Sequence, residues 1–433
     1  MRVLILSVGG SCEPVVNAIK EYRPDYVYFL CSSGQRGSER AVDGPGDPCG
    51  DPRKFKCPSC GSEHSLGNPI GKSIALQAGL ERNQYEKLLV QDPDDLNECY
   101  LKLSQLASSL ASRFPEDCLI IANYTGGTKT MSVAMAIVGT MTGKWDLSLN
   151  KGTRLDLIKV ASGTDVPIVI DKWGIFSRLQ MESVRESLKR FDYSAADGIL
   201  SAVSSKPLDK PLQDKIIRAR QICKAFNLWD KFDHPNALNL LEKVGGGEFA
   251  SYTVTLKKIL ERVRSANGYE RVGDLLLNAQ RRSSQQRYDD AVARIYRAVE
   301  LFAQIRLKMK YEIDTSNLKL DQLPPHLREE YQARVKDDGR LLFGLREDYE
   351  LLYKLHDPLG LVYDQRKEKV IDAIKRRNHS IYAHGLTPMA EEDYNKVWGT
   401  LNTFITELAK AINITLELPQ LPREEILDRL ELP

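Results

Sequence analysis

The sequence predicts an N-terminal α/β domain with a doubly wound, Rossmann-like sheet, followed by an all-α connector and an all-α C-terminal domain. Short apolar runs alternate with helical stretches through residues 1–175, as expected for a parallel sheet covered by helices. After residue 176 strand signals nearly vanish. A chain of 433 residues is long enough for two or three domains. We expect them at 1–175, 176–272 and 273–433.

The N-terminal domain shows its strands as continuous apolar runs, which are typical of strands buried on both faces of a sheet. They lie at 3–6, 26–31, 87–90 and 118–122. Helical stretches separate them at 12–22, 97–113 and 128–142. We expect two further strands, 146–149 and 156–160, with 167–170 behind them, to close the domain in antiparallel fashion.

The rest of the chain is predicted to be helical. Residues 177–227 and 251–266 form the expected connector, with three glycines between them at 245–247. In the C-terminal domain the apolar spacing of 287–310 is typical of a long amphipathic helix. Two more helices are expected at 367–384 and 391–416.

Composition limits the classes of function. A net charge of +2 means that a nucleic-acid substrate must meet local basic patches, because the whole molecule has no strong field. Eight sparse, irregular cysteines argue against a disulfide scaffold and for a reducing cytoplasm. No signal peptide is recognisable, and no apolar run reaches the roughly 20 residues of a bilayer span. We expect a soluble cytoplasmic protein without membrane association.

Arg377, Asn378 and His384 form the candidate catalytic group. On a helix, seven residues advance by about 700°, so Arg377 and His384 would share one face. An arginine holds phosphate oxygens and a histidine moves protons near neutral pH, which suffices for RNA cleavage without a metal. The alternative is that both side chains simply solvate a helix end.

Two glycine-containing turns form the candidate ligand site. One follows the strand at 118–122 and the other follows the first strand. Glycines allow close backbone approach, and a helix N-terminus presents free N–H groups to an anion. The alternative is a pair of tight strand–helix turns without a ligand. The candidate residues are Thr125, Gly126, Gly127, Thr128 and Lys129 in the later turn, and Ser7, Gly9, Gly10 and Ser11 in the first.

A cysteine-containing insertion rich in glycine and proline is the candidate metal site. Cys49, Cys57, Cys60 and His64 provide sulfur and nitrogen ligands of the kind that tetrahedral structural zinc prefers. A single Cys-x-x-Cys is only half of a zinc ribbon, so the alternative is a reduced loop without metal. No paired carboxylates indicate a catalytic metal.

Together, these motifs and their order resemble the CRISPR-associated ribonucleases that join a CARF domain to a HEPN domain. The segment from Arg377 to His384 resembles the HEPN motif, and the turns at 7–11 and 125–129 resemble the CARF loops. The resemblance implies a homodimer that binds a cyclic oligoadenylate activator in its CARF domains. It also implies metal-independent cleavage of single-stranded RNA to a 2′,3′-cyclic phosphate, with antiviral defence as the role. Arg377 would stabilise phosphate charge, His384 would transfer protons and Asn378 would position the pair.

Two other functions stay open. The chain would instead be a nucleotide-sensing transcriptional regulator if its C-terminal domain served only in dimerisation. Such a regulator needs a basic recognition helix, which the connector would have to supply. The N-terminal domain would alternatively degrade its own activator. The basic connector residues are Lys215, Arg218, Arg220 and Lys224.

Overall fold

The computed structural model describes the chain except residues 35–36, 51–53, 57–59, 66–70, 153, 156–158, 161–164 and 379–385. Side chains of 54–55, 64–65, 154–155, 159–160 and 376–378 are also outside the description. The chain divides into two compact units, Met1–Leu179 and Gln180–Pro433. The first expected boundary lies close to this division, and the predicted segments 176–272 and 273–433 fall almost wholly within the second unit.

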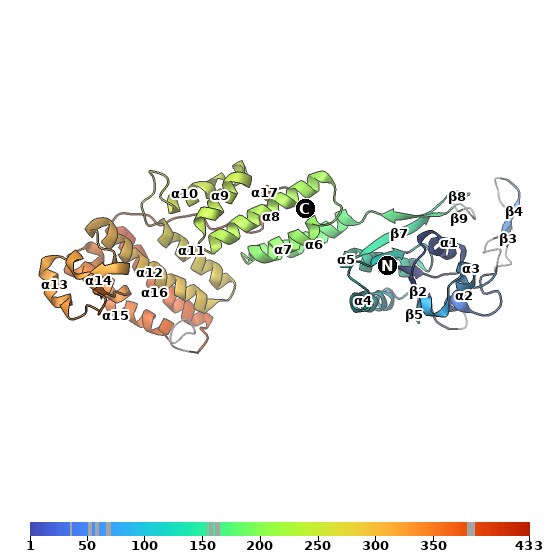
Figure 1. Ribbon diagram of the computed structural model, residues 1–433, viewed down its shortest axis with the longest axis horizontal. Coiled ribbons are helices and arrows are strands. Elements are labelled where there is room, and N and C mark those ends of the chain that lie inside the picture. The colour runs from blue at the N-terminus through green and yellow to red at the C-terminus, as the bar shows by residue number, and fades with distance from the viewer. Residues whose placement is uncertain are drawn as a thin grey trace. The chain divides into compact units, whose positions relative to one another are not determined.

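The first unit is built on a six-stranded sheet with the order β10, β7, β6, β1, β2, β5 (Figure 1). All neighbouring strands pair in parallel except β10, which is antiparallel to β7. The predicted α/β fold class is therefore confirmed. The sheet strands are β1 (Arg2–Ser7), β2 (Tyr26–Ser32), β5 (Tyr85–Val90), β6 (Leu119–Asn123), β7 (Trp145–Lys151) and β10 (Val166–Ile170).

Helices cover both faces of this sheet because alternate residues of each buried strand point to opposite faces. Leu4 and Leu6 of β1 belong to a core that also contains the apolar side of α1, whereas Val3 and Ile5 pack in the core formed with α4 and α5. The helices are α1 (Glu13–Tyr22), α2 (Glu39–Asp43), α3 (Ile74–Ala78), α4 (Leu96–Arg113), α5 (Lys129–Thr142) and the start of α6 (Trp173–Lys189), with a 3₁₀ turn at Arg82–Gln84.

The antiparallel closure differs from the expectation. The strand predicted at 146–149 is β7, and it pairs in parallel with β6, so only β10 is antiparallel. The strand predicted at 156–160 lies partly outside the described residues. Its end is β9 (Lys159–Val160), which pairs with β8 (Arg154–Leu155) in a separate two-stranded ladder. Another such ladder joins β3 (Lys54–Lys56) to β4 (Glu63–Ser65).

The second unit is helical, as predicted, apart from the short pair β11 (Leu318–Lys319) and β12 (Arg340–Leu341) within the described residues. One large apolar core joins α11, α12, α14, α15 and α16. The helices after α6 are α7 (Tyr193–Ser204), α8 (Lys210–Asp230), α9 (His234–Val244), α10 (Ala250–Ile259), α11 (Glu270–Ser284), α12 (Tyr288–Tyr311), α13 (Pro325–Gln332), α14 (Leu345–Lys354), α15 (Pro358–Asn378), α16 (Glu391–Ala411) and α17 (Glu425–Arg429), with 3₁₀ turns at Gly247–Phe249, Thr315–Asn317 and Leu320–Gln322.

Two helix ends in this unit differ from the predicted ones. Helix α10 ends at Ile259 and not at 266, because Glu261 takes a left-handed conformation with φ of 56°. Helix α16 ends at Ala411 and not at 416, and Asn413 likewise has a positive φ of 55°. Within the described residues, none of the helices combines the length and the apolar character needed to span a bilayer.

Candidate functional site

The two predicted ligand turns lie side by side at one edge of the sheet. Strand β1 pairs in parallel with β6, with Leu6 opposite Asn123, so the turns that follow these strands are neighbours. The strand order also reverses here: the chain moves from β1 to β2 and β5 on one side, then returns to β6 on the other. Open α/β sheets bind ligands in the crevice at such a switch point.

The turns are in direct contact. Ser7 Oγ donates a hydrogen bond to the carbonyl oxygen of Gly126 at 2.6 Å. A Cβ atom on Gly9 would lie 2.9 Å from the backbone nitrogen of Gly127, so a side chain there would force the turns apart. Gly127 itself has a φ of 78°, in the left-handed region that favours glycine. These glycines are therefore required by packing, whether or not a ligand binds. Around Gly10, by contrast, a Cβ would meet no atom within 4 Å.

The two threonines of the later turn hold it in place. Thr128 caps α5, because its Oγ1 accepts a hydrogen bond from Met131 N at 3.2 Å, and it also donates to the carbonyl oxygen of Pro93 at 2.6 Å. Thr125 Oγ1 accepts a hydrogen bond from Asn150 N at 2.6 Å. Both hydroxyls thus have protein partners.

Lys129 is the first residue of α5 and its side chain is exposed. No described residue forms a hydrogen bond or an ion pair with its ammonium group. Because helix N-termini carry free N–H groups and a partial positive charge, the ammonium adds to a position already suited to an anion.

A buried polar network beneath the turns was not predicted from the motifs. Asn123 Nδ2 donates to Ser148 Oγ at 3.0 Å and to Asn150 Oδ1 at 2.9 Å. Asn150 Nδ2 in turn donates to Asp165 Oδ2 at 2.7 Å, and Ser148 Oγ lies 2.7 Å from the hydroxyl of Tyr22. The sequence signal was the alternation of polar residues in β7, whose strand neighbours are apolar.

The predicted catalytic residues are only partly described. Arg377 and Asn378 are the last two residues of α15, and nothing is known of their side chains. His384 lies outside the described residues, so the expected shared helical face stays a prediction. The chain that follows is anchored beside the start of α12, where Met389 N donates to Asp289 Oδ2 at 3.1 Å.

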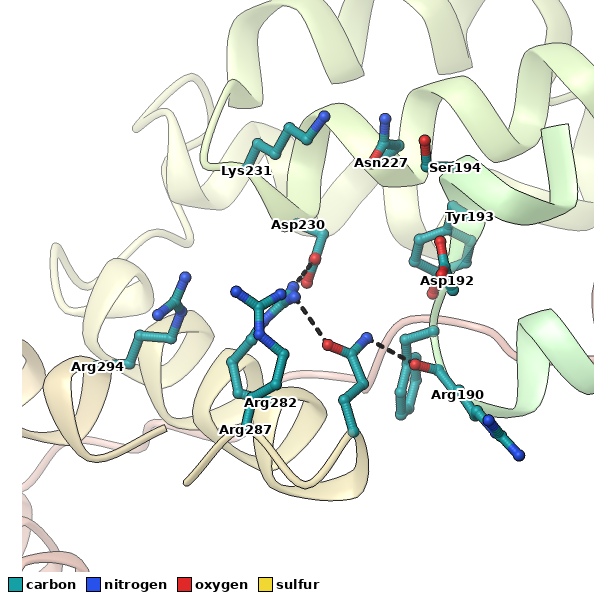
Figure 2. Close-up of a pocket in the computed structure, with 12 residues that line it drawn as sticks. Arg190, Asp192, Tyr193, Ser194, Asn227, Asp230, Lys231, Arg282, Arg287 and Arg294 are labelled. Atoms are coloured by element: carbon teal, nitrogen blue, oxygen red, sulfur yellow. Dashed lines mark hydrogen bonds and ion pairs between the residues drawn. The ribbon is translucent and has the colours of Figure 1, made fainter. Parts of the chain in front are cut away.

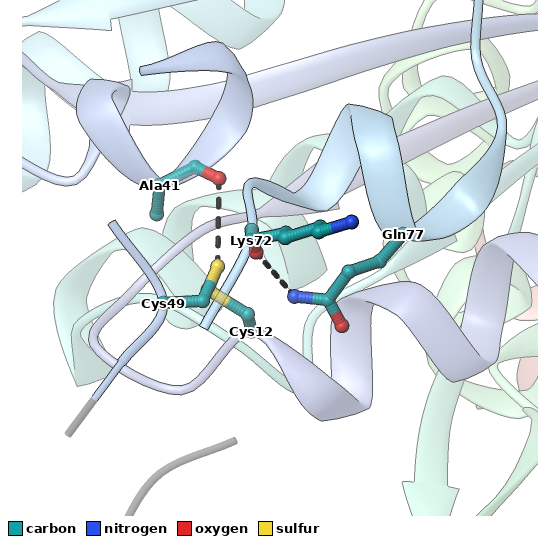
Figure 3. Close-up of a disulfide and its surroundings, with 5 residues drawn as sticks. All are labelled: Cys12, Ala41, Cys49, Lys72 and Gln77. Atoms are coloured by element: carbon teal, nitrogen blue, oxygen red, sulfur yellow. Dashed lines mark hydrogen bonds between the residues drawn. A yellow bond between two sulfur atoms is a disulfide. The ribbon is translucent and has the colours of Figure 1, made fainter. Parts of the chain in front are cut away.

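The predicted zinc site is wrong for Cys49. Its sulfur is bonded to that of Cys12, so it does not provide a thiolate to a metal (Figure 3). The disulfide also departs from the expectation of reduced cysteines. The fold brings together two buried residues that lie 37 positions apart, at the start of α1 and in the loop after α2. Cys57 and the His64 side chain lie outside the description, and Cys60 is exposed.

Comparison with known proteins identifies two relationships. Residues 261–410 match the family model of the Csm6 HEPN domain. The solved structure of Enterococcus italicus Csm6 bound to cyclic hexa-2′-fluoro-hexa-dAMP is similar to the whole chain, with a TM-score of 0.54 and 14% sequence identity. That similarity covers 100% of this chain and 98% of the Csm6 chain, and at this identity it shows the fold. No curated protein matches the chain.

Proposed function

We take as our premise that residues 261–410 form a HEPN domain of the Csm6 family within a chain of Csm6 fold, as the resemblance to CARF–HEPN ribonucleases led us to expect, and we propose that the protein is a CRISPR effector endoribonuclease. The single observation that carries this proposal is the family match, because the segment from Arg377 to His384 lies inside it. The substrate we propose is single-stranded RNA.

The proposed reaction needs no metal. The 2′-hydroxyl of the RNA attacks the adjacent phosphorus and loses its proton, and the bond from phosphorus to the 5′-oxygen breaks. The 5′-oxygen gains a proton, so the products are a 2′,3′-cyclic phosphate and a 5′-hydroxyl. His384 would transfer protons, Arg377 would stabilise the charge that develops on the phosphate, and Asn378 would position the two. Each protomer of a homodimer would contribute this group to a shared site.

The activator we propose is a cyclic oligoadenylate that binds at the sheet edge of the first unit. Three observations support it: the position at the switch point of the sheet, the exposed Lys129 at a helix N-terminus, and the cyclic hexanucleotide bound to Enterococcus italicus Csm6. Allosteric activation then requires that the ligand bind the active arrangement more tightly than the idle one. The proposed contact residues are Ser7, Gly9, Gly10, Ser11, Thr125, Gly126, Gly127, Thr128 and Lys129.

The alternative function as a DNA-binding regulator has less support. Its recognition helix would be α8, yet the basic side chains of this helix have acidic partners. Arg218 pairs with Glu248 at 2.9 Å, and Lys215 pairs with Glu431 at 2.8 Å. Arg220 pairs with Asp197 at 3.0 Å. Base contacts would require these ion pairs to break.

The test is cleavage of a fluorogenic single-stranded RNA by the full-length protein in EDTA, with and without cyclic tetra- or hexa-adenylate. We expect ligand-stimulated cleavage that Arg377→Ala and His384→Ala abolish. Lys375→Ala and His326→Ala are matched controls, because both side chains are exposed and lie outside the motif. Cleavage that survives both motif substitutions, or that never occurs, would refute the ribonuclease. A shift of duplex DNA would then favour the regulator.

A further inference from the structure

A cavity of about 650 Å³ in the second unit has a strongly basic lining (Figure 2). It lies between the start of α7, the end of α8 and the turn from α11 to α12. Of its twelve lining residues, five are cationic and two are acidic. The cationic residues are Arg190, Lys231, Arg282, Arg287 and Arg294.

The most deeply placed of these cations is Arg282, which is 7% exposed. Its guanidinium pairs with Asp230, and Nη1 donates to Gln285 Oε1 at 2.9 Å. Its Nε atom is buried, and no described residue accepts a hydrogen bond from it. Buried N–H groups normally have a partner, so this donor indicates that an acceptor is missing from the cavity.

Too few carboxylates compensate the cationic lining. Arg287 Nη2 lies 2.5 Å from Asp290 Oδ2, and Arg294 pairs with the other oxygen of the same carboxylate. Asp230, the partner of Arg282, is also bound by the fully buried Arg281 at 2.7 Å. Burial, together with the charges of Arg294 and Arg287, lowers the pKa of Arg282 to about 10. An anion in the cavity would relieve this excess of positive charge.

Side-chain exposure increases from the floor of the cavity to its rim. It is 9% for Arg282, 28% for Arg294 and 55% for Arg287. Lys231, across the cavity on α8, is exposed as well. A row of cations that leads from a buried floor to the surface fits a phosphate that is part of a chain, because the chain can continue over the rim.

The cavity lies at the end of α12 that also anchors the chain after the candidate catalytic motif. Arg287 immediately precedes α12. Tyr288, the first residue of this helix, has its ring 5.7 Å from that of Tyr394 on α16, and Asp289 accepts the hydrogen bond from Met389. A polynucleotide bound at the motif can therefore continue along this end of the helix bundle.

We propose that this cavity binds a phosphate group of the RNA substrate away from the bond that is cut. The inference rests on the proposed ribonuclease function and adds a substrate-positioning site to it. Guanidinium groups bind phosphate oxygens in bidentate fashion, and the free Nε–H of Arg282 provides a donor at the floor. The site has no role in the bond-breaking step itself.

The test measures the binding of a fluorescent 2′-O-methyl RNA oligonucleotide, which lacks the attacking hydroxyl and cannot be cleaved, to the full-length protein across a salt series. The variant is the double substitution Lys231→Gln/Arg287→Gln at the exposed rim. The control is Lys224→Gln/Arg297→Gln, which removes the same two residue types from the same helices outside the cavity. We expect the rim variant to bind about tenfold more weakly, with a salt slope reduced by about 1.4, and the control to bind as the wild type does.

Three results would overturn the proposal: an unchanged affinity of the rim variant, an equal loss in the control, or no binding of RNA by the wild type. A competition arm with AMP and inorganic phosphate separates the sources of the anion. If these raise the melting temperature of the wild type and not of the rim variant, while RNA affinity is equal in both, the site takes a small phosphorylated ligand and not RNA. Binding without any cleavage of ordinary RNA would refute the ribonuclease and leave this site intact.

Discussion

Ser7 Oγ donates a hydrogen bond of 2.6 Å to the carbonyl oxygen of Gly126, a residue 119 positions later in the chain. The bond joins the turns after β1 and β6 at the switch point of the sheet. It orients both turns toward the same crevice, so displacement of one turn will displace the other. The candidate activator site is therefore a single unit assembled from two distant segments.

Gly9→Ala is expected to destabilise the first unit, and Gly10→Ala is its matched control. A Cβ at residue 9 would lie 2.9 Å from Gly127 N, whereas one at residue 10 meets nothing within 4 Å. Overpacking of this kind costs about 1–3 kcal/mol. Urea unfolding of both variants will measure the difference. Equal free energies of unfolding for the two variants would contradict the close packing of the turns.

Lys129→Gln is expected to weaken activator binding without a change in stability. The exposed ammonium has no partner among the described residues, and a hydrogen bond to a charged group contributes about 1.5–3 kcal/mol. The activator concentration for half-maximal cleavage should rise about tenfold or more, with the rate at saturation unchanged. Lys144→Gln, an exposed lysine after α5, is the control. If both variants respond alike to the activator, Lys129 has no special role.

Reduction of the Cys12–Cys49 disulfide is expected to destabilise the first unit. The bond closes a loop with a sequence separation of 37 residues, which corresponds to about 4 kcal/mol by the chain-entropy relation. Chemical unfolding with and without dithiothreitol will measure it. Cys12→Ser should be insensitive to the reductant, whereas Cys60→Ser should behave as the wild type does. Equal alkylation of unfolded protein before and after reduction would show that the bond is absent.

Asp348→Asn is expected to change how stability depends on pH. Asp348 is fully buried, and burial, with the charges of Glu300 and Glu347, raises its pKa to about 7. Between about pH 4 and pH 7 the unfolded chain releases this proton while the folded chain retains it, so stability falls as pH rises. The total fall is on the order of 4 kcal/mol and ends above pH 7.

The asparagine variant lacks this titration, so its stability should rise relative to the wild type from pH 4.5 to pH 7.5. Urea unfolding at both pH values will test this. Asp321→Asn, which changes an exposed aspartate, is the control and should follow the wild type. Parallel curves for Asp348→Asn and the wild type would mean that the carboxyl group ionises normally in the folded protein.

The sequence by itself determined the fold class, because runs such as Val3 to Leu6 are apolar at every position and only a strand covered on both faces buries all of them. It also located the two turns of the candidate ligand site, since parallel strands place their following turns at one edge. The HEPN assignment followed from the local spacing of Arg377 and His384. All of these features are written in short stretches of sequence.

Only the tertiary structure decided which distant residues meet. Cys49 looked like a metal ligand beside Cys57 and Cys60, yet its partner is Cys12 at the start of α1. The basic cavity likewise depends on α8 and α12 lying close together, which no local pattern reveals. Local periodicity reports which face of an element is buried, but a disulfide, a polar network or a cavity depends on distances between elements, and these are set by the packing of the whole core.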